Sequence, residues 1–279
     1  MNNRSTQTGG RLHVIATPIG NIEDLSPRAA DTLGRVALIA AEDTRRTGRL
    51  LMHIGAKTRL LACHEHNEEK VLEVLIAALH DGADVALVSD AGTPLISDPG
   101  WRLVRSAAAR GYEIVTVPGP SAVTAALSVS GLPTDRFVFE GFLPRRAAQR
   151  RDRLDALAAE ARTMVFFESV HRIAAAVDAL VAAFGADRPA ALARELTKIH
   201  ESVSRGTLGD LAAGLGSSIP LLGEFVLVVG GAEVVDSTDA EIIRTYALLA
   251  DELPPAKARS LCVSLTGASR NRVYALTQT

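Results

Sequence analysis

Aromatic residues and cysteines are scarce in this chain of 279 residues. Only 4 % of the residues are aromatic, whereas 47 % are apolar, with Ala, Val and Leu dominant. Such small side chains favour helices packed closely against sheets over an all-β fold. The two cysteines, Cys63 and Cys262, lie far apart and show no metal-ligand spacing. They are typical of small core residues in a reducing cytoplasm, and we expect no metal.

Long apolar runs and a strong net charge are also missing. No stretch approaches the roughly 20 apolar residues that span a bilayer, and residues 1–10, MNNRSTQTGG, lack the apolar segment of a signal peptide. We therefore expect a cytoplasmic protein with no membrane segment, in which residues 1–10 form a disordered leader. The net charge of −2 gives no global basic field, so a polyanion would have to bind at a local patch.

Several common motifs are absent as well. No G-x-G-x-x-G follows a predicted strand and no G-x-x-x-x-G-K-[ST] occurs, which excludes the dinucleotide fingerprint and the P-loop. No G-x-S-x-G is present, so no hydrolase-type nucleophile elbow is expected. His64, Glu65 and His66 are adjacent rather than spaced as H-E-x-x-H, and we interpret them as loop side chains facing water.

In the first half, apolar runs alternate with segments of helical periodicity. Ser26 followed by Pro27 marks one helix start, Asn67 caps another helix, and Asp98 with Pro99 starts a third. Short apolar strands that alternate with helices predict βαβ units and a mostly parallel sheet with helices on both faces. The predicted strands are residues 12–16, 36–40, 59–62, 85–88 and 113–117.

The second half has fewer helices and more closely spaced strands, which predicts a mixed α/β sheet. We expect an N-terminal α/β domain over residues 11–119, a C-terminal α/β domain over 120–234 and a helical tail over 235–279, broken at Pro254-Pro255. The strand signals of the second domain are FVFEG, TMVFFES, PAALARE, TKIHESVSRG and EFVLVVG.

Turn-rich loops follow four strands of the first half. In a parallel sheet these loops emerge together at the carboxyl edge, where open α/β sheets bind ligands. Glycine and proline let backbone groups approach a ligand closely, although tight βα turns alone would explain any single loop. The four together predict a pocket with backbone-rich walls and a few acids. The loops begin TPIGN, AEDTR, SDAGTP and PGPSA.

A local cluster of arginines lies at the predicted domain junction. Residues 144–153 read PRRAAQRRDR, with five arginines and one acid. A solvated helix start would explain the run, but a loop rich in arginine can also grip phosphates. We predict an RNA-binding patch at Arg145, Arg146, Arg150 and Arg151, extended by Arg45 and Arg46 beside the pocket.

Seven motifs in order carry a family resemblance that covers the chain from Leu12 to Leu222, together with the tail. The chain resembles the tetrapyrrole-methylase-like S-adenosylmethionine (SAM) enzymes, in particular those that methylate small-subunit ribosomal RNA. The resemblance implies a homodimer of two-domain class III methyltransferase-like α/β protomers, SAM held in the cleft, and 2′-O-methylation of a cytidine in the decoding region of 16S rRNA. The motifs are TPIGN, AAEDTR, VSDAGTPLISDPG, PGPSA, TDRFVFEGFLP, FFESVHR and ARELTKIHE.

The resemblance also implies which residues hold the cofactor. The first-half loops contribute walls after strands one, four and five, and second-half residues close over the SAM. The implied cofactor-binding residues are Pro18, Asp90, Gly92, Thr93, Pro94, Ser121, Ala122, Phe167, Ala193, Arg194 and Leu222.

A ribose 2′-hydroxyl is a weak nucleophile while protonated, so a positioned base accelerates its methylation by about 10²–10⁴-fold. The motif AAEDTR at the carboxyl edge makes Asp43 the first catalytic candidate and Glu42 the second. Aspartate at this position also commonly caps the helix that follows. Both interpretations stay open at this point.

Three functions are compatible with the residues. The first is an rRNA ribose methyltransferase acting on 16S rRNA or the small ribosomal subunit. The second is a C-methyltransferase of a tetrapyrrole ring, and the third is a non-catalytic ribosome-binding protein. The arginine run 144–153 favours the first over the second, and a saturable SAM site would exclude the third.

Overall fold

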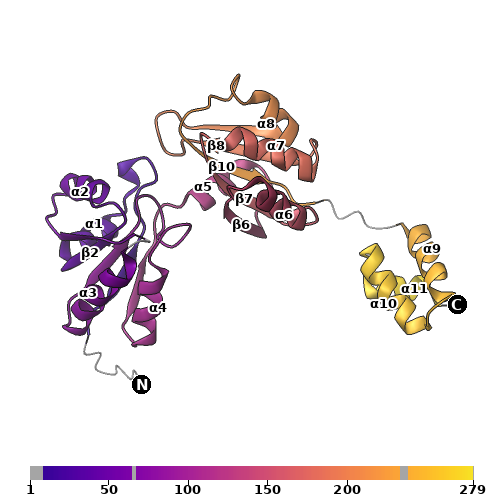
Figure 1. Cartoon of the computed structure of the whole chain (residues 1–279), viewed down its shortest axis with the longest axis horizontal. Helices are drawn as coiled ribbons and strands as arrows, with labels where there is room; N and C mark the ends of the chain where they lie inside the picture. Colours follow the sequence, from indigo (N-terminus) through magenta and orange to yellow (C-terminus); the bar gives the residue numbers. More distant parts are fainter. Residues whose placement is uncertain (1–8, 65–66, 233–237, 279) are drawn as a thin grey trace. The chain divides into compact units, whose positions relative to one another are not determined.

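The computed structural model describes residues 9–64, 67–232 and 238–278. The chain divides into two compact units, one ending at Gly230 and one beginning at Gly231 (Figure 1). The leader predicted over residues 1–10 lies mostly outside the described residues, as do Glu65 and His66. Gly10 is buried, and its N–H donates to the carbonyl of Leu79 at 2.7 Å, so the predicted leader does not extend to Gly10.

The first sheet is fully parallel, as the alternation of strands and helices predicts. Its strand order is β3-β2-β4-β1-β5. Every neighbouring pair is parallel, so the loops after the strands leave at one edge. The strands are β1 (Leu12–Ile15), β2 (Leu38–Ala41), β3 (Arg59–Ala62), β4 (Val85–Val88) and β5 (Ile114–Val117).

Alternate strand residues face two separate apolar layers. Leu38 and Val85 pack with α3 and α4, whereas Ile39 and Ala86 pack with α1 and α2 on the other face. Both faces of these strands are therefore buried, which is why the strands are apolar throughout. The helices are α1 (Pro27–Arg35), α2 (Thr44–His53), α3 (Glu68–His80) and α4 (Trp101–Ala109).

The structure confirms some of the helix starts that were predicted from the sequence. Ser26 caps α1, since its Oγ accepts from Ala29 N, and Pro27 occupies the first turn. Asn67 precedes α3 but does not cap it through its side chain. Its amide instead accepts from His64 N and donates to the carbonyl of Ala62, which fixes the loop before the helix. Helix α4 starts at Trp101 and not at Asp98-Pro99 as predicted, because Gly100 is left-handed at its N-cap position.

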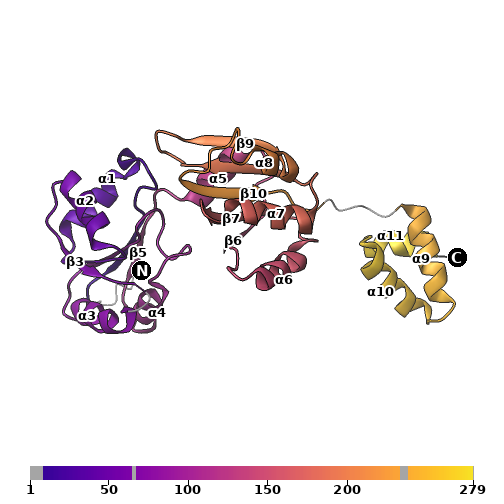
Figure 2. The same ribbon diagram turned by 45° about the horizontal axis from the view of Figure 1, so that its top comes forward.

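The second sheet is mixed, as expected. Its order is β6-β7-β10-β8-β9, in which only β6 and β7 run parallel. Helix α5 (Ala122–Ser130) packs on one face, and α6 (Ala147–Leu157), α7 (Ile173–Phe184) and α8 (Leu208–Gly214) pack on the other (Figure 2). The strands are β6 (Phe137–Phe142), β7 (Thr163–Ser169), β8 (Pro189–Arg194), β9 (Ser202–Thr207) and β10 (Glu224–Val229).

The segment TKIHESVSRG is only partly a strand. Residues 197–201 form a turn, and the strand begins at Ser202. Glu195 and Thr197 have φ values of 50° and 64°, so the backbone is left-handed there and leaves the sheet. Both sheets belong to the first compact unit, and the domain boundary expected at residues 119–120 stays a prediction.

The second unit consists of three helices, as expected for the tail: α9 (Asp239–Ala250), α10 (Pro255–Thr266) and α11 (Arg270–Leu276). They bury their own small core around Ile242, Cys262 and Val273. Cys63 and Cys262 are both buried. Among the described residues, every helix is too short or too polar to cross a bilayer.

Candidate active site

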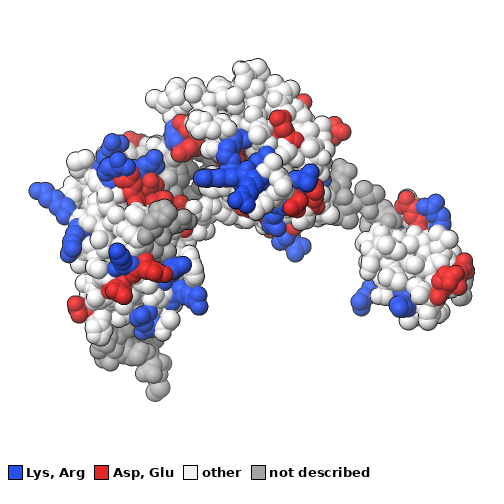
Figure 3. All heavy atoms as spheres, viewed as in Figure 1, with Lys and Arg blue, Asp and Glu red and all other residues white. Residues whose placement is uncertain are grey.

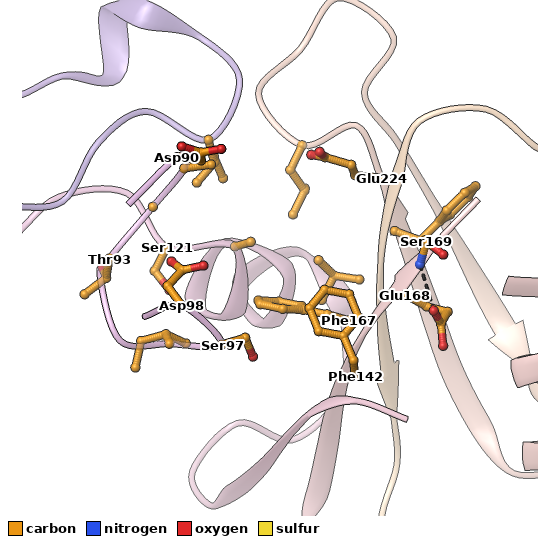
Figure 4. A pocket seen from close by; sticks show the side chains of 18 of the residues that line it. Asp90, Thr93, Ser97, Asp98, Ser121, Phe142, Phe167, Glu168, Ser169 and Glu224 are labelled. Carbon is orange, nitrogen blue, oxygen red and sulfur yellow. Dashed lines mark hydrogen bonds between the residues drawn. The ribbon is translucent and has the colours of Figure 1, made fainter. Parts of the chain in front are cut away.

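A cavity of about 350 Å³ lies at the carboxyl edge of the first sheet, between the loop after β4 and one face of the second sheet (Figure 4). Asp90, Thr93 and Asp98 lie on one side of it, and Phe167 and Glu224 lie on the other. The remaining lining residues are Ile19, Glu42, Arg46, Ala91, Gly92, Ile96, Ser97, Ser121, Ala122, Phe142, Glu168, Ser169, Ala193, Leu196, Phe225 and Val226.

The strand order explains why the cavity opens at the end of β4. Strand β4 lies between β2 and β1. The helices that follow β1 and β2 cover one face of the sheet, whereas the helix that follows β4 covers the other. Loops that diverge to opposite faces leave a crevice at the carboxyl ends of neighbouring strands, where open α/β sheets bind ligands.

The loop after β4 is held in an uncommon backbone conformation. Thr17 pairs with Gly92 in an isolated antiparallel bridge, and its Oγ1 donates to the carbonyl of Ser89. Leu95 and Ser97 have φ values of 76° and 68°, in the left-handed region that non-glycine residues avoid. Each such residue costs about 1–3 kcal/mol, and strain of this kind is concentrated at functional sites.

Asp98 is a site residue that the sequence analysis assigned only to a helix start. It lines the cavity and is hydrogen-bonded to Ser89. Burial raises the pKa of Asp98 to about 6, against the opposing hydrogen bond from Ser89 and with a further contribution from the Glu42 and Asp90 carboxylates. The motif VSDAGTPLISDPG contains Asp98, but its spacing alone does not show which way the loop turns.

The two predicted catalytic acids differ in position. Glu42 lines the cavity, and burial raises its pKa above the ordinary value while the N–H of Asp90 opposes this by donating to it. Asp43 does not line this cavity. It caps α2 by accepting from Arg45 N, and it holds the Arg45 guanidinium at 2.7 Å. These contacts place the pKa of Asp43 well below its usual range.

Asp90 joins the loops after β2 and β4. Its Oδ1 accepts from Asp43 N at 2.9 Å, and its Oδ2 lies 3.5 Å from Arg46 Nε. Thr93 Oγ1 donates to the carbonyl of Pro120, which ties the same loop to the one after β5. The convergence of loops predicted from the sequence is thus made by side chains that bond to neighbouring backbones.

The second sheet supplies an aromatic and acidic wall. The ring of Phe167 meets Phe139 and Phe142 edge to face, with centroids 4.9 and 5.7 Å apart. Glu168 lies beside Phe167 and is 4 % exposed. Its Oε1 accepts from Ser169 N, whereas Oε2 lies 3.3 Å from Arg172 without hydrogen-bond geometry to any described residue. Sequence reasoning named Phe167 but missed Glu168, Ser169 and Glu224.

Most of the cofactor residues implied by the resemblance reach the cavity, and four do not. Pro18 lines a second, adjoining cavity, and Pro94 is buried within its loop. Arg194 is buried and donates to the carbonyl of Leu222, whose side chain is 69 % exposed. The implied residues that line the cavity are Asp90, Gly92, Thr93, Ser121, Ala122, Phe167 and Ala193.

The predicted arginine patch gathers around the start of α6. Figure 3 shows lysine and arginine side chains clustered in the region of β6 and α6. Arg145, Arg146 and Arg151 are exposed, and no described carboxylate forms an ion pair with them or with Arg150. Arg172 supports the loop by donating to the carbonyl of Leu143 at 2.5 Å.

The other two predicted RNA-binding arginines lie on α2, and each has a carboxylate partner. Arg45 is exposed and binds Asp43 through two nitrogens. Arg46 lines the cavity beside Asp90. Within the part of the chain that is described, no group of histidine, cysteine, aspartate or glutamate side chains has the arrangement of a metal site.

Two protein-family models together match almost all of the chain. Residues 11–212 match the model of tetrapyrrole (corrin/porphyrin) methylases, and residues 236–278 match the RsmI C-terminal HTH domain. Among solved structures, uroporphyrin-III-C-methyltransferase from Thermus thermophilus is similar over 79 % of this chain and 94 % of its own, with a TM-score of 0.57 and 24 % identity. That likeness shows the fold.

Curated relatives are much closer in sequence. Ribosomal RNA small subunit methyltransferase I of Xylella fastidiosa strain Temecula1 is 53 % identical over 96 % of this chain and 98 % of its own. The proteins of that name from Pseudomonas aeruginosa and Escherichia coli O157:H7 are 49 % and 47 % identical, and cover 96 % and 95 % of this chain and 96 % and 93 % of their own lengths. The chain therefore belongs to the tetrapyrrole methylases and, within them, to the family of ribosomal RNA small subunit methyltransferase I.

Proposed function

We propose that the chain methylates the 2′-hydroxyl of a cytidine ribose in the decoding region of 16S rRNA, with SAM bound in the cavity after β4. Family membership makes it a SAM-dependent methyltransferase, and the names of its relatives favour small-subunit rRNA as the substrate. The observation that carries the proposal is the cavity itself, which gathers seven of the implied cofactor residues, among them Asp90, with the carboxyl groups of Glu42 and Asp98.

The residues present fit SAM. A volume of about 350 Å³ lies within the range of roughly 300–1,000 Å³ typical of small-molecule sites. Phe167 offers an apolar surface for an adenine ring, while Asp90 and Asp98 offer acceptors for ribose hydroxyls and an ammonium group. Bound SAM supplies an electrophilic methyl group on a positively charged sulfur, which a pocket rich in carboxylates attracts.

The structure changes our choice of base. A group that removes a proton from the ribose hydroxyl works best with a pKa near the operating pH. Asp98, with a pKa of about 6, meets this requirement, and Glu42 is displaced in the same direction. Asp43 is held ionised by Arg45, and its strongly lowered pKa makes it a poor base. We therefore propose Asp98 as the base, with Glu42 second.

The arginine patch around α6 is the proposed rRNA contact outside the cavity. Exposed guanidinium groups without carboxylate partners bind phosphates in a salt-dependent way and need no net positive charge on the whole protein. A ribosomal substrate is consistent with a cytoplasmic location, and we keep the homodimer implied by the resemblance as a proposal. Sedimentation equilibrium of the full chain measures the latter directly.

Two measurements on the full chain test the function. Calorimetric titration with S-adenosylhomocysteine is expected to show one saturable site per chain. Mass mapping of ribose methylation on 16S rRNA, with SAM and with or without the protein, is expected to gain one methylated cytidine in the decoding region. Methylation of a tetrapyrrole with an unchanged rRNA map would favour the C-methyltransferase alternative. Absence of cofactor binding would favour the non-catalytic one.

A further inference from the structure

A second cavity of about 350 Å³ adjoins the first. The two share walls at Ile19, Arg46, Asp90, Ala91 and Glu224. The cavities are therefore neighbours on the same carboxyl edge, and a ligand that extends out of the first has the second as a continuation. The residues that line only the second are Thr17, Pro18, Gly20, Ile22, Thr47, Arg49, Leu50, Ser89 and Lys198.

Three cations line the second cavity: Arg46, Arg49 and Lys198. Arg46 and Arg49 are three residues apart on α2, so they lie on the same face of the helix. Both are exposed. A concave wall that presents two guanidinium groups in this way is suited to a phosphate, which the planar fork of arginine binds through paired hydrogen bonds.

The three cations differ in how far their charge is already engaged. Lys198 Nζ lies 2.8 Å from Glu195 and 3.0 Å from Glu224. Arg46 contacts Asp90 only through Nε at 3.5 Å, and its two terminal nitrogens donate to no described residue. Arg49 has no carboxylate partner among the described residues. The two arginines thus retain donors for a ligand, whereas Lys198 is occupied.

The wall opposite α2 is firmly built. A Cβ on Gly20 would lie 2.8 Å from both the carbonyl of Leu196 and Oγ1 of Thr197, so only glycine fits there. Asn21 N donates to the same Thr197 Oγ1 at 3.0 Å. The loop after β1 is therefore fixed against the loop after β8, and the engaged Lys198 belongs to that support.

We infer that the second cavity receives a phosphate that flanks the methylated ribose, held by Arg46 and Arg49. The inference rests on the proposed function, in which the first cavity holds the methyl donor. An acceptor ribose in a polynucleotide carries a phosphodiester on each side, so a site that reaches the 2′-hydroxyl also meets a phosphate. The adjoining cavity with two available guanidinium groups supplies its partners, apart from the arginine patch around α6.

The test uses two small probes with the full chain saturated with S-adenosylhomocysteine. Cytidine 3′,5′-bisphosphate and cytidine are titrated into the wild type, Arg49→Gln, Arg46→Gln and the control Arg59→Gln. Arg59 is an exposed arginine at the start of β3, at the amino edge of the sheet, so its loss matches the change in charge away from both cavities. We expect the wild type and the control to prefer the bisphosphate by about tenfold or more.

Loss of about tenfold in that preference is expected for Arg49→Gln, with the affinities for cytidine and S-adenosylhomocysteine unchanged. An Arg49→Gln protein that keeps the full preference, a wild type that shows none, or a variant that loses S-adenosylhomocysteine instead would overturn the inference. Each of these results leaves the methylation map of the wild type intact. Two other results would contradict the proposed function itself. One is a 16S rRNA methylation map that is the same with and without the protein, and the other is the absence of a binding site for S-adenosylhomocysteine.

Discussion

At the scale of single residues, the position of Asp98 combines a chemical use with a cost to stability. Its carboxyl group is drawn from water by the loop after β4, and its pKa rises to about 6. A group whose pKa is higher in the folded state than in the unfolded chain favours folding only while it is protonated. The benefit is fully present below the unfolded value of about 4 and is lost as the pH rises through about 6.

Replacement of Asp98 by Asn removes the cost of keeping an ionised carboxylate away from water at high pH. We expect Asp98→Asn to raise the free energy of unfolding at pH 8 by about 1–3 kcal/mol, because the amide is neutral at every pH. The difference should shrink toward zero as the pH falls to about 4. Urea unfolding at several pH values measures it, and a gain that is equal at pH 4 and pH 8 would contradict the assigned pKa.

The same substitution tests the proposed base. Wild-type methylation at saturating substrates should fall as the pH drops below about 6, where Asp98 becomes protonated. Asp98→Asn should lower the rate by about 10²-fold or more and flatten this profile, while S-adenosylhomocysteine still binds within a few-fold of the wild-type affinity. If the variant methylates at the wild-type rate, the base lies elsewhere, and Glu42→Gln is the next protein to measure.

Asp43 provides the contrasting case. Asp43→Ala should destabilise the chain by about 1 kcal/mol, because the first turn of α2 loses its cap. Asp43→Asn keeps a capping oxygen and should restore most of that loss, and it should methylate rRNA like the wild type. Thermal unfolding and the methylation rate separate the two roles. A large loss of rate in Asp43→Asn with intact donor binding would return Asp43 to the chemistry.

The acids of this site show what spacing does and does not reveal. Glu42 directly follows β2 and Asp90 lies two residues beyond the end of β4, so their place at the carboxyl edge could be predicted from the pattern of the chain. Asp98 lies ten residues beyond the end of β4. It turns back to the cavity only because Leu95 and Ser97 adopt left-handed backbone angles that their residue types do not announce.

At the scale of elements, the close approach of two loops makes one glycine indispensable. Gly20→Ala should destabilise the first unit by about 1–3 kcal/mol, because the added methyl group overlaps backbone and side-chain atoms of residues 196–198. Gly34→Ala is the matched control on α1, where a Cβ meets only Ala56 at 3.9 Å. Denaturant unfolding compares the two, and equal stabilities would show that the loops separate easily.

Strands and helices were predicted where the residue pattern is local. The five strands of the first sheet follow from short apolar runs with turn residues between them, with β2 displaced by one or two residues. The segment 197–201 was wrong as a strand, because its departure from the sheet depends on tertiary contacts. Asn21 bonds to Thr197 and Glu224 to Lys198, and both partners lie far away in sequence.

At the scale of the whole molecule, the second unit has an apolar core of its own. The three C-terminal helices pack around Ile242, Cys262 and Val273. We expect a chain ending at residue 232 to fold and to bind S-adenosylhomocysteine like the full chain. Calorimetry and thermal unfolding check both points, and loss of donor binding in the shortened chain would contradict the independence of the units.

The architecture of the molecule was predictable to different depths. The alternation of strands and helices indicated the parallel sheet and the ligand edge from physical rules alone. The class III methyltransferase-like arrangement came from the resemblance of long motifs, because periodicity cannot show which face of a second sheet closes a cavity. For that reason periodicity did not place Glu168 or Glu224 at the site, although the motif FFESVHR contains Glu168.

Arg46 and Asp90 line both of the two neighbouring cavities. A ligand that draws the guanidinium of Arg46 toward one side leaves Asp90 less compensated on the other. Thermodynamic linkage makes this effect reciprocal: if the first ligand changes the affinity for the second by some factor, the second changes the affinity for the first by the same factor. The methyl donor and the acceptor RNA would then bind cooperatively rather than independently. Conversion of SAM to S-adenosylhomocysteine would change the residence time of the RNA.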